Sequence, residues 1–483
     1  MLEHRPAKRL ANELALDFDR DDGPGLADQL HHRLREAIVT GRIPGGSKLP
    51  STRDLAKQLG VSRNTVIDAF ERLLAESCLV ARRGSGTFVG DTLDRPKVVN
   101  DPPDMVKGQK RRFILPAAAS PGTLICDLRP GLPDLRRFPL TEWRRAALRK
   151  LRAETLLFQK DSDEGLGIPL LRAAISEYIS VSRGATYGCE QILVTSGAQQ
   201  AFSLLAQVIA RPRMVVAVED PGYPAAIEPF AQAGARIAPV PVDREGLVVD
   251  AIPKDAKLIY TTPAHQFPLG VAMSARRRHA LLQWAAASDA WVVEDDYDSE
   301  YRFGGVRLKA LQALDRNDRV IYVGSFSKTL LPSIRLGFVG LPLKLTESMI
   351  YAKRIADRHT ASFSQAVLAE FMSTGAFAQH LRRMNALYEE RHAALSSTLK
   401  NMDPTLAHLV RSDSGLHATL LLPSQYDVPT LIHRAASIGI GLYGLETFCR
   451  QAKLNGLILG FGNVETQALV RGVQQIPYLL NSA

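Results

Sequence analysis

Residues Gly324–Gly337, GSFSKTLLPSIRLG, directly follow the apolar run VIYV at 320–323. Lys328 therefore lies just beyond a predicted strand, between small hydroxyl residues, with Arg335 seven positions further on. A lysine amine that its neighbours desolvate can form an imine with an aldehyde. Ser325, Ser327 and Arg335 offer hydroxyl donors and a fixed positive charge for a phosphate dianion. This stretch predicts a site for an aldehyde cofactor that carries a phosphate.

Five runs rich in β-branched residues each end in a polar or glycine cluster. They are ILVTSGAQQ (192–200), MVVAVEDPGYP (214–224), KLIYTTPAHQFPLG (257–270), AWVVEDDYDSE (290–300) and VIYVGSFSK (320–328). Their alternation with helical segments from residue 126 onward predicts an α/β fold with a mainly parallel sheet. Ligands of such sheets lie beyond the carboxyl ends of the strands. The five endings therefore predict one shared crevice.

Other strand ends carry groups suited to a pyridine ring and its phosphate. Gly197, Ala198 and Gln199 begin a helical segment whose first amides can donate to a phosphate. Asp295 can pair with a protonated ring nitrogen, as in pyridoxal sites, and Tyr297 can donate to the phenolic oxygen. With Lys328, these residues predict pyridoxal 5′-phosphate as the cofactor.

Tyr223, in PGYP, can stack flat on a heteroaromatic ring. Each of these assignments has a structural alternative. Tyr223 can instead be a packed loop aromatic, and Asp295 can be a cap or an ion-pair partner. The joint occurrence of all the groups, in this order, favours the cofactor interpretation.

The N-terminal part of the chain has helical periodicity. Ser51 begins the segment STRDLAKQLG with a capping pattern, and Gly60 ends it. Ser62 then caps VSRNTVIDAFERLLAES, so two short helices joined by a tight turn predict a helix-turn-helix whose second helix enters the major groove. The segment LVARRGSGTFV predicts a two-stranded wing. The candidate DNA contacts are Ser51, Arg53, Ser62, Arg63, Asn64, Thr65, Arg82 and Arg83.

The stretches LPSTRDLAKQLGVSRNTVIDAFERL and GSGTFV resemble the winged helix-turn-helix of the GntR family of bacterial regulators. The strand-end motifs, with LRAAISEYISVSRG and HLRRMNALYEERH, resemble a fold-type I aminotransferase, which has a smaller α+β C-terminal domain. The combination resembles the MocR (GabR-like) subfamily of transcriptional regulators. This resemblance implies pyridoxal phosphate held on the lysine, an amino-compound effector that displaces the lysine, and a head-to-tail homodimer.

The sequence departs from the aminotransferase pattern at several positions. Ser162 stands about where a tyrosine usually reaches the partner subunit's phosphate. His265 and Gln266 replace an Asn-Pro segment over the cofactor, and His265 is either a cofactor contact or a structural donor. The usual carboxylate-binding arginine is replaced by the apolar run Leu457–Leu459. Arg450 is a candidate substitute for effector binding, with a solvated surface role as the alternative. In the member of the subfamily that responds to GABA, an arginine follows GYP, where this chain has Ala225.

The net charge, the cysteine content and the N-terminal residues indicate which partners and which compartment to expect. The net charge of +10 in 483 residues suits an anionic partner without requiring one. Four scattered cysteines, which form no metal-ligand pair, and an N-terminus without an apolar core predict a cytoplasmic protein without a membrane segment. We expect a DNA-binding domain at 15–90, a linker at 91–125 and an aminotransferase-like domain at 126–483. The alternative for 91–125 is a loop packed over the next domain.

The resulting hypothesis is a regulator that binds double-stranded operator DNA, carries pyridoxal phosphate on Lys328, and senses a small amine, an amino acid or the cofactor itself. One alternative is an active aminotransferase that also regulates; at most weak transamination is expected because the carboxylate arginine is absent. A second alternative is a repressor whose large domain serves only for dimerisation.

Overall fold

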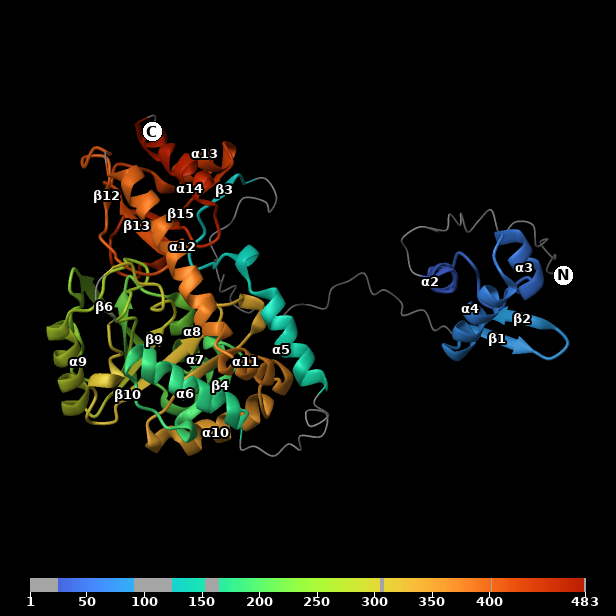
Figure 1. Cartoon of the computed structure of the whole chain (residues 1–483), viewed down its shortest axis with the longest axis horizontal. Coiled ribbons are helices and arrows are strands. Elements are labelled where there is room, and N and C mark those ends of the chain that lie inside the picture. The colour runs from blue at the N-terminus through green and yellow to red at the C-terminus, as the bar shows by residue number, and fades with distance from the viewer. Residues whose placement is uncertain (1–24, 91–123, 153–164, 305–307, 401, 482–483) are drawn as a thin grey trace. The chain divides into compact units, whose positions relative to one another are not determined.

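A computed structural model describes residues 25–90, 124–152, 165–304, 308–400 and 402–481. The chain forms two compact units, Met1–Arg112 and Phe113–Ala483, which are considered separately (Figure 1). Most of the predicted linker, residues 91–123, lies outside the described residues, as does the predicted start of the first domain at 15–24. None of the described helices is long and apolar enough to cross a membrane.

The first unit contains the predicted helices and wing. Its elements are α2 (Leu26–Val39), α3 (Thr52–Leu59), α4 (Arg63–Ala75), β1 (Leu79–Arg82) and β2 (Gly86–Val89). Gly60 adopts a left-handed conformation, with φ of +63°, and ends α3. The apolar faces of the helices meet in one core that includes Leu34, Val66 and Phe70. β1 and β2 pair antiparallel, so the wing predicted from LVARRGSGTFV is a hairpin.

The second unit contains an eight-stranded sheet with the order β4-β11-β10-β9-β8-β5-β6-β7. Its strands are β4 (Ile192–Thr195), β5 (Val215–Asp220), β6 (Arg236–Asp243), β7 (Gly246–Leu247), β8 (Ala256–Thr261), β9 (Trp291–Asp296), β10 (Val320–Ser325) and β11 (Gly337–Gly340). β5, β6, β8, β9 and β10 run parallel to one another, whereas β11 pairs antiparallel with both β10 and β4. The predicted mainly parallel α/β sheet is therefore confirmed.

Helices cover both faces of this sheet. They are α5 (Leu140–Arg152), α6 (Pro169–Arg183), α7 (Ala198–Ile209), α8 (Pro224–Gln232), α9 (Ala275–Ala287), α10 (Leu343–Asp357) and α11 (Ser362–Ser373). Val293 packs in a core with Phe202 of α7, whereas its neighbour Val292 packs with Leu281 of α9. Consecutive strand residues point to opposite faces. The continuous apolar runs of the sequence are thus explained by burial on both sides.

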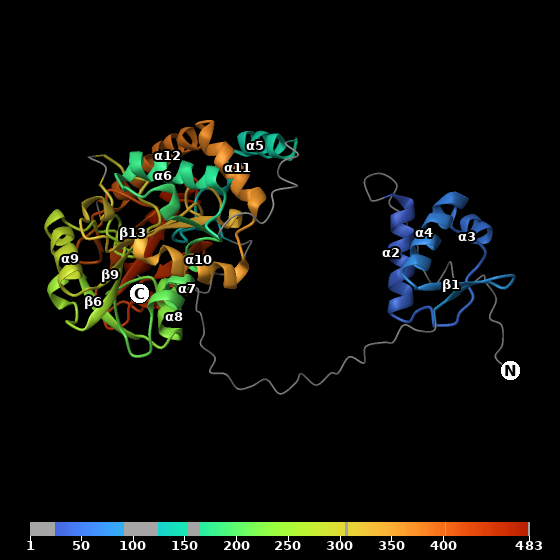
Figure 2. The same cartoon turned by 90° about the horizontal axis from the view of Figure 1, so that it is seen from below.

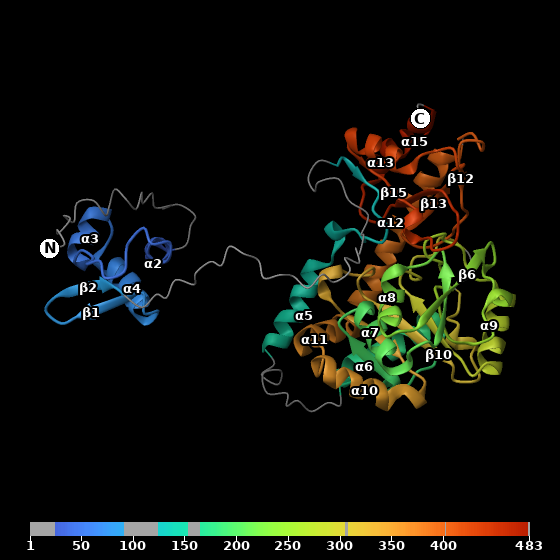
Figure 3. The same cartoon turned by 180° about the vertical axis from the view of Figure 1, so that it is seen from behind.

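The C-terminal part is a smaller α+β region (Figure 3). It contains α13 (Val428–Ser437), α14 (Thr466–Gln474), α15 (Ile476–Asn481) and the four-stranded sheet β12-β13-β16-β15, formed by His408–Leu409, His417–Leu421, Gly456–Gly460 and Tyr443–Gly444. Two short strands, β3 (Cys126–Asp127) and β14 (Ile440–Gly441), pair in parallel. The long helix α12 (Ala376–Leu399) contributes Phe377 to a core beneath the large sheet and Leu395 to the C-terminal core, so it joins the two parts (Figures 1 and 2).

Candidate cofactor site and DNA-binding residues

The five runs singled out in the sequence are β4, β5, β8, β9 and β10 with the loops that follow them. All five strands point in the same direction in one sheet, because the antiparallel β11 restores the direction between β10 and β4. Their carboxyl ends therefore lie along one edge, as predicted. The residues described below come from these endings and from loops that meet them.

Lys328 lies three residues beyond β10. Its Nζ donates a hydrogen bond to the carbonyl of Gly131 at 2.5 Å, and its own carbonyl accepts one from the Tyr301 hydroxyl at 3.1 Å. Burial lowers the pKa of the Lys328 amine, although the carboxylates of Asp298 and Asp295 oppose that shift. A lowered pKa makes a neutral, nucleophilic amine more accessible at ordinary pH.

Gly131 supplies the carbonyl that accepts the hydrogen bond from Lys328. It has φ of +72°, and a Cβ at this position would lie 3.0 Å from Nζ of Lys328. Only a glycine lets this backbone pass so close to the amine. The sequence motifs did not indicate Gly131, since its neighbours Pro130 and Leu132 match none of the five runs.

Asp295 is the next-to-last residue of β9 and accepts a 2.6 Å hydrogen bond from the hydroxyl of Tyr260 on the neighbouring strand β8. Burial raises the pKa of Asp295 to about 7, and the Tyr260 hydrogen bond opposes the rise. In its ionised form, this carboxyl group can pair with a positively charged partner such as a pyridinium nitrogen. Tyr260 was not predicted as a site residue, although it lies in the quoted run of β8.

Tyr297 and His265 lie close together. The Tyr297 hydroxyl is 3.0 Å from Nδ1 of His265, and the same nitrogen is 3.0 and 3.2 Å from the carboxylate oxygens of Asp298. The opposite nitrogen of His265, Nε2, is buried and has no hydrogen-bond partner among the described residues. Asp298 and His265 thus orient Tyr297, and Asp298 is a second residue that the sequence did not single out.

The groups predicted to bind phosphate also converge. Gly197 precedes α7 with φ of +92°, and a Cβ there would lie 3.7 Å from Nη1 of Arg335. A Cβ on Gly337 would lie 2.9 Å from the Cα of Gly197, so both glycines permit this close packing. The guanidinium of Arg335 is thereby brought to the N-terminus of α7, where backbone amides and the helix dipole also favour an anion.

Ser325, Ser327 and Gln199 border the same region. The backbone N–H of Ser327 donates to Oγ of Ser325 at 3.2 Å, which orders the turn before Lys328. The Gln199 side chain donates to the carbonyl of Ala225 at 2.9 Å and ties the start of α7 to the start of α8. Ala198 is the first residue of α7. These contacts order the edge that is predicted to bind phosphate.

Phe267 is the centre of an aromatic cluster at the strand ends. Its ring lies 5.5 Å from that of Tyr223, 6.0 Å from Tyr297, 5.4 Å from His417 and 4.9 Å from Phe448. Tyr223 is 39% exposed, so part of its ring is open to a ligand. The sequence motifs indicate Tyr223 but not Phe267, because an apolar residue in a loop carries no chemical signature of its own.

Arg450 lies in a C-terminal loop that is bound to the end of β5. The backbone N–H groups of Arg450, Gln451 and Ala452 each donate to the Asp220 carboxylate at 2.8 Å. The Arg450 side chain is exposed. The loop lies near the aromatic cluster because Gly222 donates to the carbonyl of Phe448 at 2.9 Å. Arg450 as an effector contact remains a prediction, and Ser162 lies outside the described residues.

In the first unit, the predicted DNA contacts divide into two groups. Ser51 and Ser62 are N-caps: Ser51 Oγ accepts from the N–H of Asp54 at 3.2 Å, and Ser62 Oγ accepts from the N–H of Thr65 at 3.1 Å. The hydroxyls of Ser62 and Thr65 are also 2.8 Å apart. These hydroxyls therefore help to start the helices.

The remaining predicted contacts are exposed. Arg53 is the second residue of α3, and Arg63 and Asn64 occupy the first turn of α4. In the wing, the Arg82 guanidinium lies 4.8 Å from the ring centroid of Phe88, and Arg83 is exposed at the tip. Exposed cations at a helix start and on a wing can contact an anionic backbone, so these residues stay predicted DNA contacts.

The residues of the second unit fit pyridoxal 5′-phosphate. They supply a desolvated amine at Lys328, an acidic partner for a ring nitrogen at Asp295, and an ordered hydroxyl at Tyr297. Gly197 and Gly337 leave room for Arg335 beside the first amides of α7. Bound pyridoxal 5′-phosphate would supply an aldehyde carbon to which one amine at a time can be joined.

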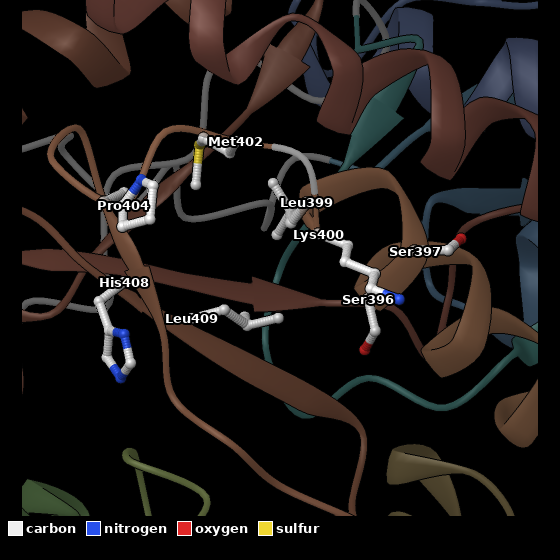
Figure 4. A pocket seen from close by; sticks show the side chains of 9 residues that line it. Ser396, Ser397, Leu399, Lys400, Met402, Pro404, His408 and Leu409 are labelled. Carbon is white, nitrogen blue, oxygen red and sulfur yellow. The ribbon is translucent and has the colours of Figure 1, made fainter.

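A separate surface pocket lies in the C-terminal part (Figure 4). It has a volume of about 540 Å³ and is lined by the end of α12 and by β12, including Leu399, Lys400, Met402 and His408. It shares no residue with the Lys328 cluster, and among the described residues its Lys400 and His408 side chains form no hydrogen bond to a buried polar group. We therefore assign the candidate cofactor site to the strand ends.

Comparison with known proteins supports both units. The family described as bacterial regulatory proteins of the gntR family matches residues 26–89, and aminotransferase class I and II matches residues 130–429. Kynurenine aminotransferase from Pyrococcus horikoshii, solved in complex with PMP, superposes with a TM-score of 0.69 at 28% identity, covering 75% of this chain and 92% of that chain. Fold and site thus define a helix-turn-helix regulator with an aminotransferase-type domain.

Full-length relatives carry the same two parts. The chain is 34% identical over 481 residues to the probable rhizopine catabolism regulatory protein MocR of Rhizobium meliloti, covering 95% of each. It is 31% identical over 458 residues to the pyridoxine biosynthesis transcriptional regulator PdxR of Corynebacterium glutamicum, covering 95% of this chain and 96% of the relative. This chain belongs to the GntR family of transcriptional regulators, in the MocR-like group that carries an aminotransferase class I and II domain.

Proposed function

We propose that this regulator holds pyridoxal 5′-phosphate on Lys328 and uses it to sense a small amine or amino acid, or the cofactor itself. The observation that carries the proposal is the convergence of Lys328, Asp295 and Tyr297 at one edge of the sheet. Lys328 is buried enough to lower its amine pKa, and Asp295 is buried enough to raise its carboxyl pKa. The lowered pKa of the Lys328 amine favours exchange of one amine for another at an aldehyde carbon, and the hydrogen bond from Tyr260 helps Asp295 to ionise beside a positively charged ring nitrogen.

The cofactor assignment is tested by absorbance and chemical reduction. Purified protein given pyridoxal phosphate should develop imine absorbance, and borohydride should fix the cofactor to Lys328. Lys328→Ala should lose both signals and keep its circular dichroism spectrum. Cofactor still fixed to Lys328→Ala would contradict the assignment of this lysine. No absorbance in the wild-type protein would instead favour a large domain that serves only for dimerisation.

We propose a head-to-tail homodimer as the working form. Several helices of the second unit expose large apolar side chains, which are unusual on a monomeric surface when they gather. They include Leu148 and Leu151 of α5, Leu170 of α6, Tyr351 and Ile355 of α10, and Phe363 of α11. Sedimentation equilibrium tests the proposal, and a monomer at micromolar concentration would contradict it.

Signalling follows from differential binding. An effector that replaces Lys328 on the cofactor changes the contacts of the crevice. If two arrangements of the dimer bind the effector with different affinity, the effector shifts the populations of these arrangements. This shift repositions the DNA-binding modules of residues 15–90. We place this regulator in the cytoplasm, where operator DNA is found. Steady keto-acid production from an amino donor at ordinary enzyme rates would favour the active aminotransferase instead.

A further inference from the structure

The titratable side chains near the Lys328 amine are negatively charged or neutral. The carboxylates of Asp298 and Asp295 are the charged groups that favour its protonated form. His417 is fully buried, which keeps its pKa well below the usual value, so its ring is neutral at pH 7. Arg335 lies on the phosphate side, next to Gly197. Beyond the phosphate edge, the charged groups that act on the amine among the described residues are therefore carboxylates, and the Arg450 side chain, on the loop that carries Phe448, is exposed rather than buried against the ligand.

The C-terminal residues that adjoin the aromatic cluster form an apolar wall behind it. In β16, Ile458 packs in a buried cluster with Leu269 and Leu445, and Phe448 borders that cluster. Leu269 follows Phe267 closely in the loop after β8, so this cluster adjoins the aromatic one. A carboxylate placed against such a wall would lose its hydration without gaining a partner, which is strongly unfavourable.

Aromatic rings form the part of the wall that a ligand can reach. Phe267 and Phe448 are partly exposed, and Tyr223 is exposed. The contact between Phe267 and Phe448 joins the large sheet to the C-terminal loop, which Asp220 holds in place through three N–H groups. An edge-to-face aromatic wall favours a flat apolar group on the ligand.

We propose that the signal is a primary amine that carries an aromatic or apolar group and no acidic group. This inference rests on the proposed function. The nitrogen of the incoming amine forms its bond to the aldehyde carbon as the bond to Lys328 breaks. Its two hydrogens end on Nζ of Lys328, so no oxidant, reductant or water is consumed. The amine body then packs against Phe267.

The test compares two compounds that differ only in a carboxylate. Full-length protein loaded with pyridoxal phosphate is titrated with 2-phenylethylamine and with L-phenylalanine, and the change in imine absorbance is followed. We expect half-saturation at a concentration at least about tenfold lower for 2-phenylethylamine, because the carboxylate of L-phenylalanine finds no buried counter-charge beside the apolar residues. Equal or tighter binding of L-phenylalanine, or no response to either compound, overturns the inference.

The second part of the test changes the wall. Phe267→Leu should weaken the binding of 2-phenylethylamine about tenfold. It should leave the binding of ethylamine unchanged, since ethylamine has no ring that could pack against Phe267. Tyr478→Leu, at a position that is 70% exposed, is the matched control and should alter neither titration. An unchanged 2-phenylethylamine titration in Phe267→Leu also overturns the inference.

Failure of this inference is distinguishable from failure of the proposed function. Wild-type protein that shows imine absorbance and borohydride attachment at Lys328, but prefers L-phenylalanine, retains the proposed function and loses only the class of signal. Protein without imine absorbance loses the proposed function itself.

Discussion

The Tyr260 hydroxyl donates a 2.6 Å hydrogen bond to Oδ2 of Asp295. The two residues come from neighbouring parallel strands, β8 and β9, and both are buried. Without such a donor, a buried carboxyl would be pushed further towards its neutral form. The tyrosine therefore helps to keep Asp295 able to ionise when a positively charged ring nitrogen is placed beside it.

Tyr260→Phe should raise the pKa of Asp295 further and weaken cofactor binding. A hydrogen bond to a charged group contributes about 1.5–3 kcal/mol, so the dissociation constant for pyridoxal phosphate should rise roughly 10- to 100-fold. Titration of the cofactor-free protein by absorbance measures this change. Tyr322→Phe is the control, because Tyr322 donates to Asp296, the neighbouring carboxylate on the other face of β9. An equal loss of affinity in both variants would contradict a specific role for Tyr260.

The raised pKa of Asp295 predicts a pH-dependent stability of the cofactor-free protein. The pKa is about 7 in the folded chain and 3.8 in the reference state, so the folded chain binds the extra proton between these values. Stability should fall as pH rises through this window, because ionisation costs more in the folded state. The free energy of unfolding of Asp295→Asn, compared with that of the wild-type protein, should therefore be about 1–3 kcal/mol more favourable to the folded state at pH 8 than at pH 5. Thermal unfolding at the two pH values checks the sign, and a larger gain at pH 5 would contradict it.

Arg63→Ala should weaken binding to operator DNA by about 1–3 kcal/mol if Arg63 reads a guanine. The residue is exposed in the first turn of α4, so its removal should leave the fold intact. Competition binding against random duplex separates two roles: an equal loss on both DNAs assigns Arg63 to phosphate. Binding should also fall steeply as salt rises.

Ser62→Ala should destabilise the DNA-binding unit by about 1 kcal/mol, because the N–H of Thr65 loses its cap. Ser62→Asn should restore most of this stability, since asparagine is also a good N-cap. Differential scanning calorimetry of the full chain resolves the effect on this unit. If both variants weaken DNA binding without any change in stability, Ser62 acts by contacting DNA rather than by capping.

Asp220→Asn should loosen the loop at 450–452. The carboxylate accepts three backbone N–H bonds at 2.8 Å, and an amide replaces one accepting oxygen with a donor. Trypsin cleavage after the exposed Arg450 should then be roughly tenfold faster in native protein. Glu446→Gln, in the same loop region and exposed, serves as the control. An unchanged cleavage rate in Asp220→Asn would show that the loop is held by other contacts.

The predictable part of the cofactor site is the part that carries chemical signatures. Lys328, Asp295, Tyr297 and Arg335 each follow or end an apolar run, and the structure brings those runs together at one edge. Gly131 was not predictable, because its role depends on a contact with Lys328, 197 residues away in sequence. Phe267 gave no signal either, since a loop phenylalanine is equally consistent with simple core packing.

The sequence by itself determined the two domain types, the parallel sheet and the position of the lysine with the neighbours that are predicted to bind phosphate. These follow from local periodicity, from capping residues such as Ser62, and from side chains placed at strand ends. Only the tertiary structure decided which groups meet: the Tyr260 hydroxyl with Asp295, the Gly131 carbonyl with Lys328, and the Asp220 carboxylate with the backbone of the loop at Arg450. The physical reason is that these contacts join segments far apart in the chain, and their geometry arises from the packing of the whole domain rather than from any local pattern.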